Sequence, residues 1–205
     1  MGNLEKNIAI NAENRADFAR IANWIAPNAK VLDLGCGDGS LLTQLRKTHN
    51  IRGYGVEKDD ANWLKAMNNG VDVIQMDLES GLSGFEAKSF DVVILSQTLQ
   101  AVLNTEAIVH EMLRVGREAI VTFPNFGYWR HRIQSIAGRM PVSDNLPYQW
   151  YDTPNVHLCT IKDFDEFCRK GNIEIEERLV LTDKEEVHLM PNIMGSLAMY
   201  RLRAK

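Results

Sequence analysis

The sequence has few cysteines and no long apolar run. Only three of its 205 residues are cysteines, and an odd number at wide spacing argues against a disulfide framework and fits a reducing cytoplasm. No stretch approaches the roughly 20 apolar residues of a membrane-spanning helix. The first ten residues also lack the basic start and apolar core of a signal peptide. We therefore expect a cytoplasmic protein that does not enter a membrane.

Positive charge and metal-ligand patterns are sparse as well. The 23 Lys and Arg residues are outnumbered by 27 Asp and Glu residues, which argues against nucleic-acid binding. The cysteines form no CxxC pair, so no metal site is expected. A chain of this length suits one domain. We expect a single domain over residues 1–205, beginning with a loose polar tail at residues 1–13.

Strand-like and helix-like segments alternate over the first 125 residues. The expected strands are 30–35, 51–57, 71–77, 90–96 and 117–125. The expected helices are 14–25, 40–49, 59–70 and 105–115. This order is typical of a doubly wound α/β fold with a mostly parallel sheet and helices on both faces. Ligands of such sheets bind at the carboxyl ends of the strands.

The second part of the chain departs from this alternation. Residues 124–157 hold four prolines and many aromatics, so we expect an insertion with one short helix at 129–139 that covers the site or docks a partner. A helix over 160–172 follows, opened by a near capping box. Two last strands, 173–181 and 195–204, are expected to form a hairpin.

The turn "GCGDGS" after the first strand predicts a ligand close to the backbone. Its three glycines leave room for such an approach and permit positive φ. A dinucleotide-binding turn needs G-x-G-x-x-G, but Ser40 stands where the last glycine would be. Asp33, just before the turn, would repel a pyrophosphate and attract an ammonium group. The turn therefore favours an amino-acid ligand over NAD.

Two further acids end the next two strands. Glu57 follows "RGYGV", where a carboxylate could accept both hydroxyls of a ribose, and Asp77 follows "VIQM", where it could accept an adenine amino group. With Asp33 these acids match S-adenosylmethionine or S-adenosylhomocysteine. The plainer alternatives are a tight turn and helix N-caps, and Asp59 and Asp60 fit the capping role better than the three strand-end acids do.

Several segments together resemble one known family. "VLDLGCGDGSLL", "GYGVEKDD" and "FDVVILSQTLQAV" look like class I S-adenosylmethionine-dependent methyltransferases. "FPNFGYW" and "LPYQWYDTPNVHLCT" narrow the resemblance, over about residues 31–181, to the methionine biosynthesis protein MetW family. That resemblance implies an α/β Rossmann-like fold whose seven-stranded, mostly parallel sheet has the order 3-2-1-4-5-7-6 and an antiparallel last strand.

The resemblance also implies a ligand, a partner and a set of site residues. The ligand is S-adenosylmethionine or S-adenosylhomocysteine, and the partner is homoserine O-acyltransferase, which this chain would accompany as an accessory subunit of methionine biosynthesis. The implied cofactor-binding residues are Asp33, Gly35, Cys36, Gly37, Glu57, Lys58, Asp77, Leu78, Ser96 and Gln97.

A catalytic role stays open at the level of sequence. Methyl transfer needs little beyond in-line placement of the acceptor, so the alternative function is a small-molecule methyltransferase with an unknown acceptor. Segments 96–100, 124–129 and 140–157 would surround that acceptor. His157 is the candidate base, with a structural histidine as its alternative. His131, among Arg130, Arg132 and Arg139, belongs either to a solvated helix face or to a docking surface.

Overall fold

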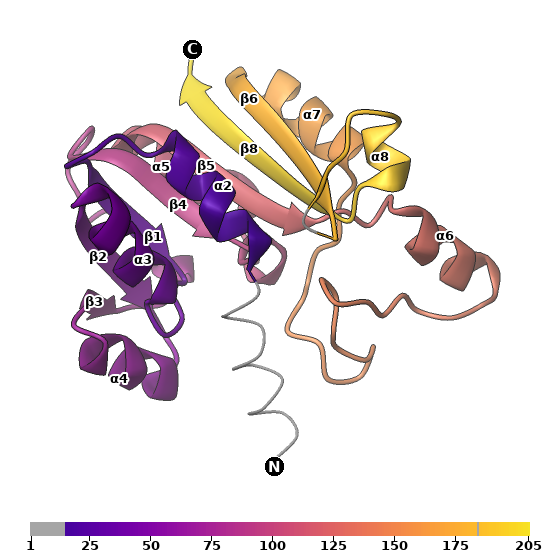
Figure 1. Ribbon diagram of the computed structural model, residues 1–205, viewed down its shortest axis with the longest axis horizontal. Coiled ribbons are helices and arrows are strands. Elements are labelled where there is room, and N and C mark those ends of the chain that lie inside the picture. Colours follow the sequence, from indigo (N-terminus) through magenta and orange to yellow (C-terminus); the bar gives the residue numbers. More distant parts are fainter. Residues whose placement is uncertain (1–14, 184) are drawn as a thin grey trace.

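One mixed β-sheet forms the centre of the molecule. The computed structural model describes residues 15–183 and 185–205, so the tail predicted over residues 1–13 lies outside the described residues. The sheet order is β3-β2-β1-β4-β5-β8-β6-β7 (Figure 1). The strands are β1 (Lys30–Leu34), β2 (Arg52–Glu57), β3 (Asp72–Gln75), β4 (Phe90–Ser96), β5 (Gly116–Pro124), β6 (Ile173–Thr182), β7 (Glu185–Glu186) and β8 (Leu197–Ala204).

The strand directions confirm the Rossmann-like methyltransferase fold. Strands β1 to β5 pair in parallel, and β8 pairs antiparallel with both β5 and β6. The expected count of seven strands is wrong, because the sheet has eight. The extra strand, β7, arises because the chain folds back after β6 and pairs Leu181 with Glu186 and Thr182 with Glu185.

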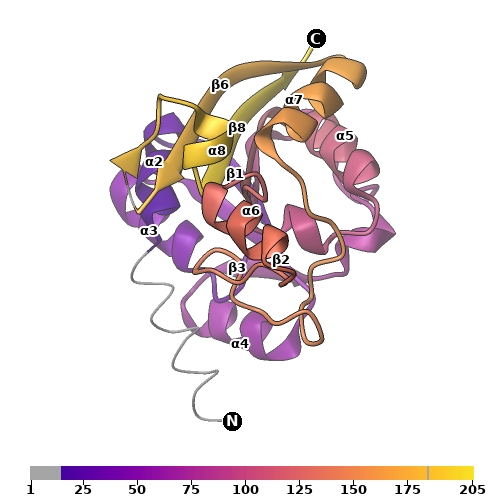
Figure 2. The same ribbon diagram turned by 90° about the vertical axis from the view of Figure 1, so that its right-hand side faces the viewer.

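Helices cover both faces of the sheet. They are α2 (Ala16–Trp24), α3 (Ser40–His49), α4 (Asp60–Asn68), α5 (Thr105–Val115), α6 (Trp129–Ile136), α7 (Ile161–Lys170) and α8 (Pro191–Met194), with the 3-10 turns η1 (Leu78–Ser80) and η2 (Leu99–Ala101). Figure 2 shows the sheet between α2 and α3 on one side and α5 and α7 on the other. No helix of the described residues is long and apolar enough to cross a lipid bilayer.

Two apolar clusters hold these layers together, and β4 contributes to both. Val92 and Ile94 join the cluster that contains side chains of α2, α3 and α4. Val93 and Leu95 join the one with α5 and α7. Side chains alternate between the faces of a strand, so a central strand covered on both faces must be apolar throughout. The apolar run "VVIL" therefore places β4 at the centre of the sheet, as expected.

The insertion leaves the sheet at the carboxyl end of β5. Its helix α6 begins at Trp129 as expected but ends at Ile136, three residues before the expected end. Phe126 N–H donates to the Cys159 carbonyl at 3.0 Å, which fastens the start of the insertion to its end. Figure 1 shows α6 and the following loop extending beyond the end of the sheet, with α8 next to them.

Candidate functional site

The glycine turn joins β1 to α3 with a backbone that side chains would obstruct. Gly35, Gly37 and Gly39 all have positive φ, at 70°, 57° and 75°. A Cβ on Gly35 would lie 2.8 Å from Thr98 Oγ1, whereas a Cβ on Gly37 would meet nothing within 4 Å. Glycine is needed at Gly35 for space and at Gly37 for conformation. The turn therefore has no Cβ at three of its five positions, on the edge where β1 and β2 end.

Glu57 fastens this turn to the end of β2. The residue is 8% exposed, and its Oε2 accepts a hydrogen bond from Gly37 N–H at 2.9 Å. Its Oε1 accepts from the N–H groups of Lys58 and Asp59, both at 2.8 Å. Three backbone donors thus fix the carboxylate beside the glycine turn. Asp59 in turn caps α4 by accepting from Asn62 N–H at 2.9 Å, as expected.

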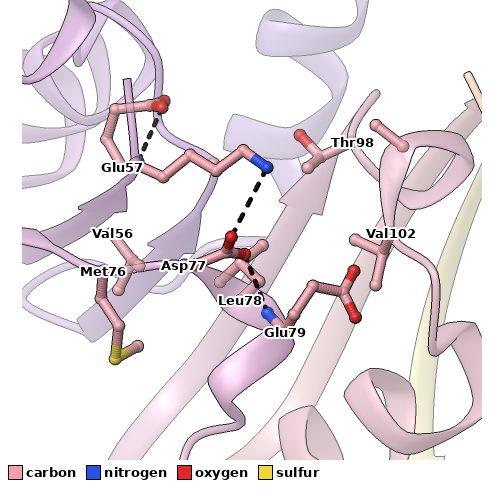
Figure 3. A pocket seen from close by; sticks show the side chains of 11 residues that line it. Val56, Glu57, Met76, Asp77, Leu78, Glu79, Thr98 and Val102 are labelled. Atoms are coloured by element: carbon pink, nitrogen blue, oxygen red, sulfur yellow. Dashed lines mark hydrogen bonds and ion pairs between the residues drawn. The ribbon is translucent and has the colours of Figure 1, made fainter. Parts of the chain in front are cut away.

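A cavity of about 150 Å³ opens between the ends of β1, β2, β3 and β4. Glu57 and Asp77 lie on one side of it, and Thr98 and Val102 lie across from them (Figure 3). Its walls are formed by Gly35, Val56, Glu57, Lys58, Met76, Asp77, Leu78, Glu79, Thr98, Ala101 and Val102. Asp77 accepts a hydrogen bond from Glu79 N–H at 3.0 Å and thereby caps η1. Its carboxylate also lies 3.7 Å from Lys58 Nζ.

Asp33 is buried in β1, next to this cavity but outside its walls. Its side chain is 3% exposed. Burial is the main cause that raises the pKa of its carboxyl to about 7; the Arg15 guanidinium opposes this shift, and the nearby carboxylates of Glu57 and Asp17 add to it. A carboxyl in such surroundings gains much from a cationic partner. No hydrogen bond from the described residues contributes to this pKa.

A hydrogen-bonded cluster around Asp17 borders the same edge of the sheet. Asp17 is 1% exposed and accepts from Arg15 Nε at 2.7 Å and Arg15 Nη2 at 2.6 Å. Arg15 Nη2 also donates to Ser96 Oγ at 2.6 Å, and Gln97 Nε2 donates to Asp17 at 3.3 Å. Gln97 has a positive φ of 51°, a backbone conformation that is uncommon outside glycine and frequent at functional sites.

The predicted site residues therefore fall into three groups. Those that line the cavity are Gly35, Glu57, Lys58, Asp77 and Leu78. Those that border it without lining it are Asp33 and Gly37, which interact with Glu57, and Ser96 and Gln97, which belong to the cluster around Asp17. Cys36 is buried, and burial raises the pKa of its thiol, so it is no nucleophile.

Arg15 and Asp17 were not predicted as site residues. The signal available in the sequence was an acid at position 17 on the apolar stripe of its helix, four residues before Ile21. A buried acid requires a partner, and Arg15 supplies it. The prediction that His131 lies on a solvated or docking face of its helix was also wrong. Its side chain is fully buried, and its ring nitrogens hydrogen-bond to Ser143 Oγ at 2.9 Å and to the Asn125 carbonyl at 3.2 Å.

A second, larger cavity of about 490 Å³ lies on the other side of η2. Its walls include residues of all three segments expected around an acceptor, among them Leu99, Pro124 and Leu146. His157 lines it too, and its Nε2 lies 3.0 Å from the Leu103 carbonyl. This contact favours a structural role for His157 over a role as a catalytic base. Among residues 15–183 and 185–205, no group of three metal-ligating side chains is placed to hold an ion.

Comparison with known proteins adds a family and a fold. A family model described as "Methionine biosynthesis protein MetW" matches residues 15–202. A "Bifunctional methionine biosynthesis protein MetXA/MetW" from Rhodopirellula baltica is 40% identical over 173 residues, covering 80% of this chain and 28% of that protein. The chain thus spans about 28% of the length of this curated relative.

Solved structures share the fold at low sequence identity. A SAM-dependent methyltransferase from Thermotoga maritima superposes with a TM-score of 0.70 at 17% identity, covering 100% of this chain and 96% of that one. A magnesium protoporphyrin IX methyltransferase from Synechocystis with bound SAH has a TM-score of 0.65 at 18% identity, with coverages of 98% and 87%. At such identities the likeness concerns the fold alone.

Proposed function

The chain belongs to the family of methionine biosynthesis protein MetW, and from this premise we propose that it binds S-adenosylmethionine or S-adenosylhomocysteine and acts with homoserine O-acyltransferase in the cytoplasm. The proposal of this ligand is based on the cavity that Gly35, Glu57 and Asp77 line together. The proposal of this partner is based on the relative that joins MetXA and MetW in one protein.

The chemistry of the cavity suits an adenosyl group. Glu57 offers its remaining acceptor site to a ribose hydroxyl, and Asp77 offers a carboxylate to the adenine amino group, with Leu78 beside the ring. The apolar side chains of Val56, Met76 and Val102 also line the cavity and would contact the faces of the base. The residues present therefore fit the ligand, in the role that the sequence assigns to each of them.

Asp33 supports the amino-acid end of the same ligand. A buried carboxyl whose pKa lies near 7 is stabilised in its ionised form by an adjacent ammonium group. Gly35 and Gly37 carry no Cβ, so a ligand can approach the main chain of the turn closely at this point. S-adenosylmethionine and its demethylated product share the ammonium, so this end does not discriminate between them.

Calorimetry with purified protein tests the ligand, and a rate assay tests the partner. We expect saturable binding of S-adenosylhomocysteine at one site per chain, and a change in the acyltransferase rate when this chain is added. S-adenosylmethionine is made from methionine, so a ligand-dependent change in that rate would report the output of the pathway. This requires different ligand affinities in the free and the complexed protein. Absence of both binding and rate change contradicts the proposal.

The second cavity favours a second candidate function, a small-molecule methyltransferase. Its volume of about 490 Å³ is within the range of ligand pockets, and η2 contributes walls to both cavities. Thr98 and Ala101 line the first, while Leu99 and Gln100 line the second. Release of S-adenosylhomocysteine from S-adenosylmethionine, screened against cell metabolites, tests this function. A protein with bound cofactor that gives no product with any metabolite fraction counts against it.

A further inference from the structure

Exposed apolar side chains gather at one end of the molecule. Sixteen large hydrophobic residues are exposed in the described part of the chain, and twelve of them fall within residues 129–158 and 189–194. We call these two segments the apolar end. Its most exposed members are Ile136 at 87%, Leu189 at 78% and Trp150 at 72%. Scattered exposed hydrophobics need no explanation, but such a concentration marks an interaction surface.

Hydrogen bonds join the two segments to each other. Asn125, just before the insertion helix, donates to the carbonyls of Asn192 at 3.2 Å and Gly195 at 2.7 Å. Asn145 Nδ2 donates to Ser196 Oγ at 3.0 Å, so the loop after α6 is also tied to the segment that follows α8. Figures 1 and 2 both show α6 and α8 next to each other beyond the end of the sheet.

This surface is held in place from within. His131 on α6 is fully buried, and its ring contacts Ser143 Oγ at 2.9 Å. Gln134 exchanges two hydrogen bonds with the backbone of Val142, at 3.0 and 3.1 Å. The outward residues of the same helix, Ile133 and Ile136, are 55% and 87% exposed. One face of this helix is anchored to the protein, and the other face exposes isoleucines. Such a helix is preorganised for binding, because docking then costs little conformational entropy.

The charge of the apolar end differs from that of the whole chain. Arg130, Arg132 and Arg139 are exposed there together with Asp144 and Asp152, which gives these two segments a charge of +1, while the chain as a whole carries a formal charge of -4. The Arg130 guanidinium lies 5.4 Å from the centre of the Trp129 ring. Trp, Tyr and Arg are the residue types enriched in the centre of protein interfaces. The surface therefore fits a partner with an apolar patch and an acidic rim.

We infer that the apolar end is the surface on which homoserine O-acyltransferase docks. This inference rests on the proposed function, which supplies the partner, and it assigns the partner to one face of the chain. The relative that contains MetXA and MetW in a single protein keeps the two parts at high local concentration. This joining favours the acyltransferase over a second copy of this chain as the occupant of the apolar end.

Docking there has a direct structural connection to the ligand cavity. The N–H groups of Val156 and His157, in the insertion, both donate to the Gln100 carbonyl at 2.9 and 3.0 Å. Gln100 lies in η2, and its neighbour Ala101 lines the cavity that contains Glu57 and Asp77. A partner that shifts the insertion would therefore move η2, which provides the coupling that regulation by a bound ligand requires.

The test measures binding of the purified acyltransferase from the same organism to the full chain and its variants. Ile133→Asp with Ile136→Asp should weaken the complex by at least about tenfold, the usual result when central interface residues are replaced. Leu64→Asp on α4 is the matched control, because Leu64 is 53% exposed and Ile133 55%. It should bind within about twofold of the parent. Unchanged calorimetric binding of S-adenosylhomocysteine verifies that each variant folds.

The outcomes separate the docking surface from the proposed function. If the parent and the α6 variant bind the acyltransferase equally well, the assignment of the docking surface is wrong, whereas the proposed partnership is supported. If the parent does not bind the acyltransferase, both are wrong. If the parent forms dimers that the α6 variant does not form, with no effect on acyltransferase binding, the surface serves a second copy of this chain and the inference fails.

Discussion

Replacing Asp33 by Asn should stabilise the ligand-free protein at pH 8 while removing its affinity for S-adenosylhomocysteine. Asp33 is buried in β1, and burial raises its pKa from an ordinary 3.8 to about 7. At pH 8 the folded protein therefore contains an ionised carboxylate that the surrounding structure disfavours. Asn has almost the same shape and no charge, so the variant loses this penalty together with the counter-charge for a ligand ammonium.

The size and the pH dependence of the effect follow from the two pKa values. One pKa unit corresponds to about 1.4 kcal/mol, so the penalty above pH 7 is about 4 kcal/mol. The unfolded state loses the Asp33 proton near pH 3.8 and the folded state near pH 7. The parent is therefore destabilised progressively as the pH rises between these values. The advantage of Asp33→Asn should fall by about 2–3 kcal/mol when the pH is lowered from 8 to 5.

Urea unfolding of the parent and the variant at pH 5 and pH 8 measures this difference, and calorimetry measures the ligand. Asp17→Asn is the matched control, since Asp17 is also buried but is held by two hydrogen bonds from Arg15. Its substitution should destabilise the protein at pH 8 by about 1–3 kcal/mol, because the guanidinium loses its partner. If Asp33→Asn is as destabilising as Asp17→Asn at pH 8, the reasoning about Asp33 is refuted.

Three further measurements test Asp33, Glu57 and the cap of α7. The affinity for S-adenosylhomocysteine should increase from pH 6 to pH 8 as Asp33 ionises, and a flat calorimetric profile contradicts the role of Asp33. Glu57→Ala should weaken the same affinity by about 1–3 kcal/mol, the range for hydrogen bonds to a charged group, and calorimetry showing no change removes Glu57 from the site. Thr160→Ala should lower the free energy of unfolding by about 1 kcal/mol, because Thr160 and Asp163 form the capping box of α7; equal urea midpoints for variant and parent would show that the cap is dispensable.

The regular elements were predictable where local signals and tertiary packing agree. α3 begins and ends at the predicted residues, because a glycine turn precedes it and Asn50 ends it in the left-handed region. β3 was predicted to reach Asp77, but it ends at Gln75 because the Asp77 side chain caps η1 instead. β7 and α8 were not predicted, since a two-residue strand and a single helical turn leave no periodic pattern.

The candidate site was predictable only in part. The acids at the end of β2 and shortly after β3 follow from strand order, and the structure brings Glu57 and Asp77 to one cavity. The contribution of Arg15 and Asp17 depends on how α2 packs across the sheet, which no local pattern specifies. The burial of His131 likewise depends on contacts with Asn125 and Ser143, a loop residue twelve positions away.

The three backbone N–H groups that converge on Glu57 limit what mutagenesis can reveal at this position. An ionised carboxylate has about four acceptor sites, and Gly37, Lys58 and Asp59 use three of them. Any substitution that removes the acceptor for a ribose therefore also releases the turn that faces the ligand. Chemical change in the ligand avoids this confusion: analogues lacking one sugar hydroxyl would report the contact while the main chain around Glu57 stays intact.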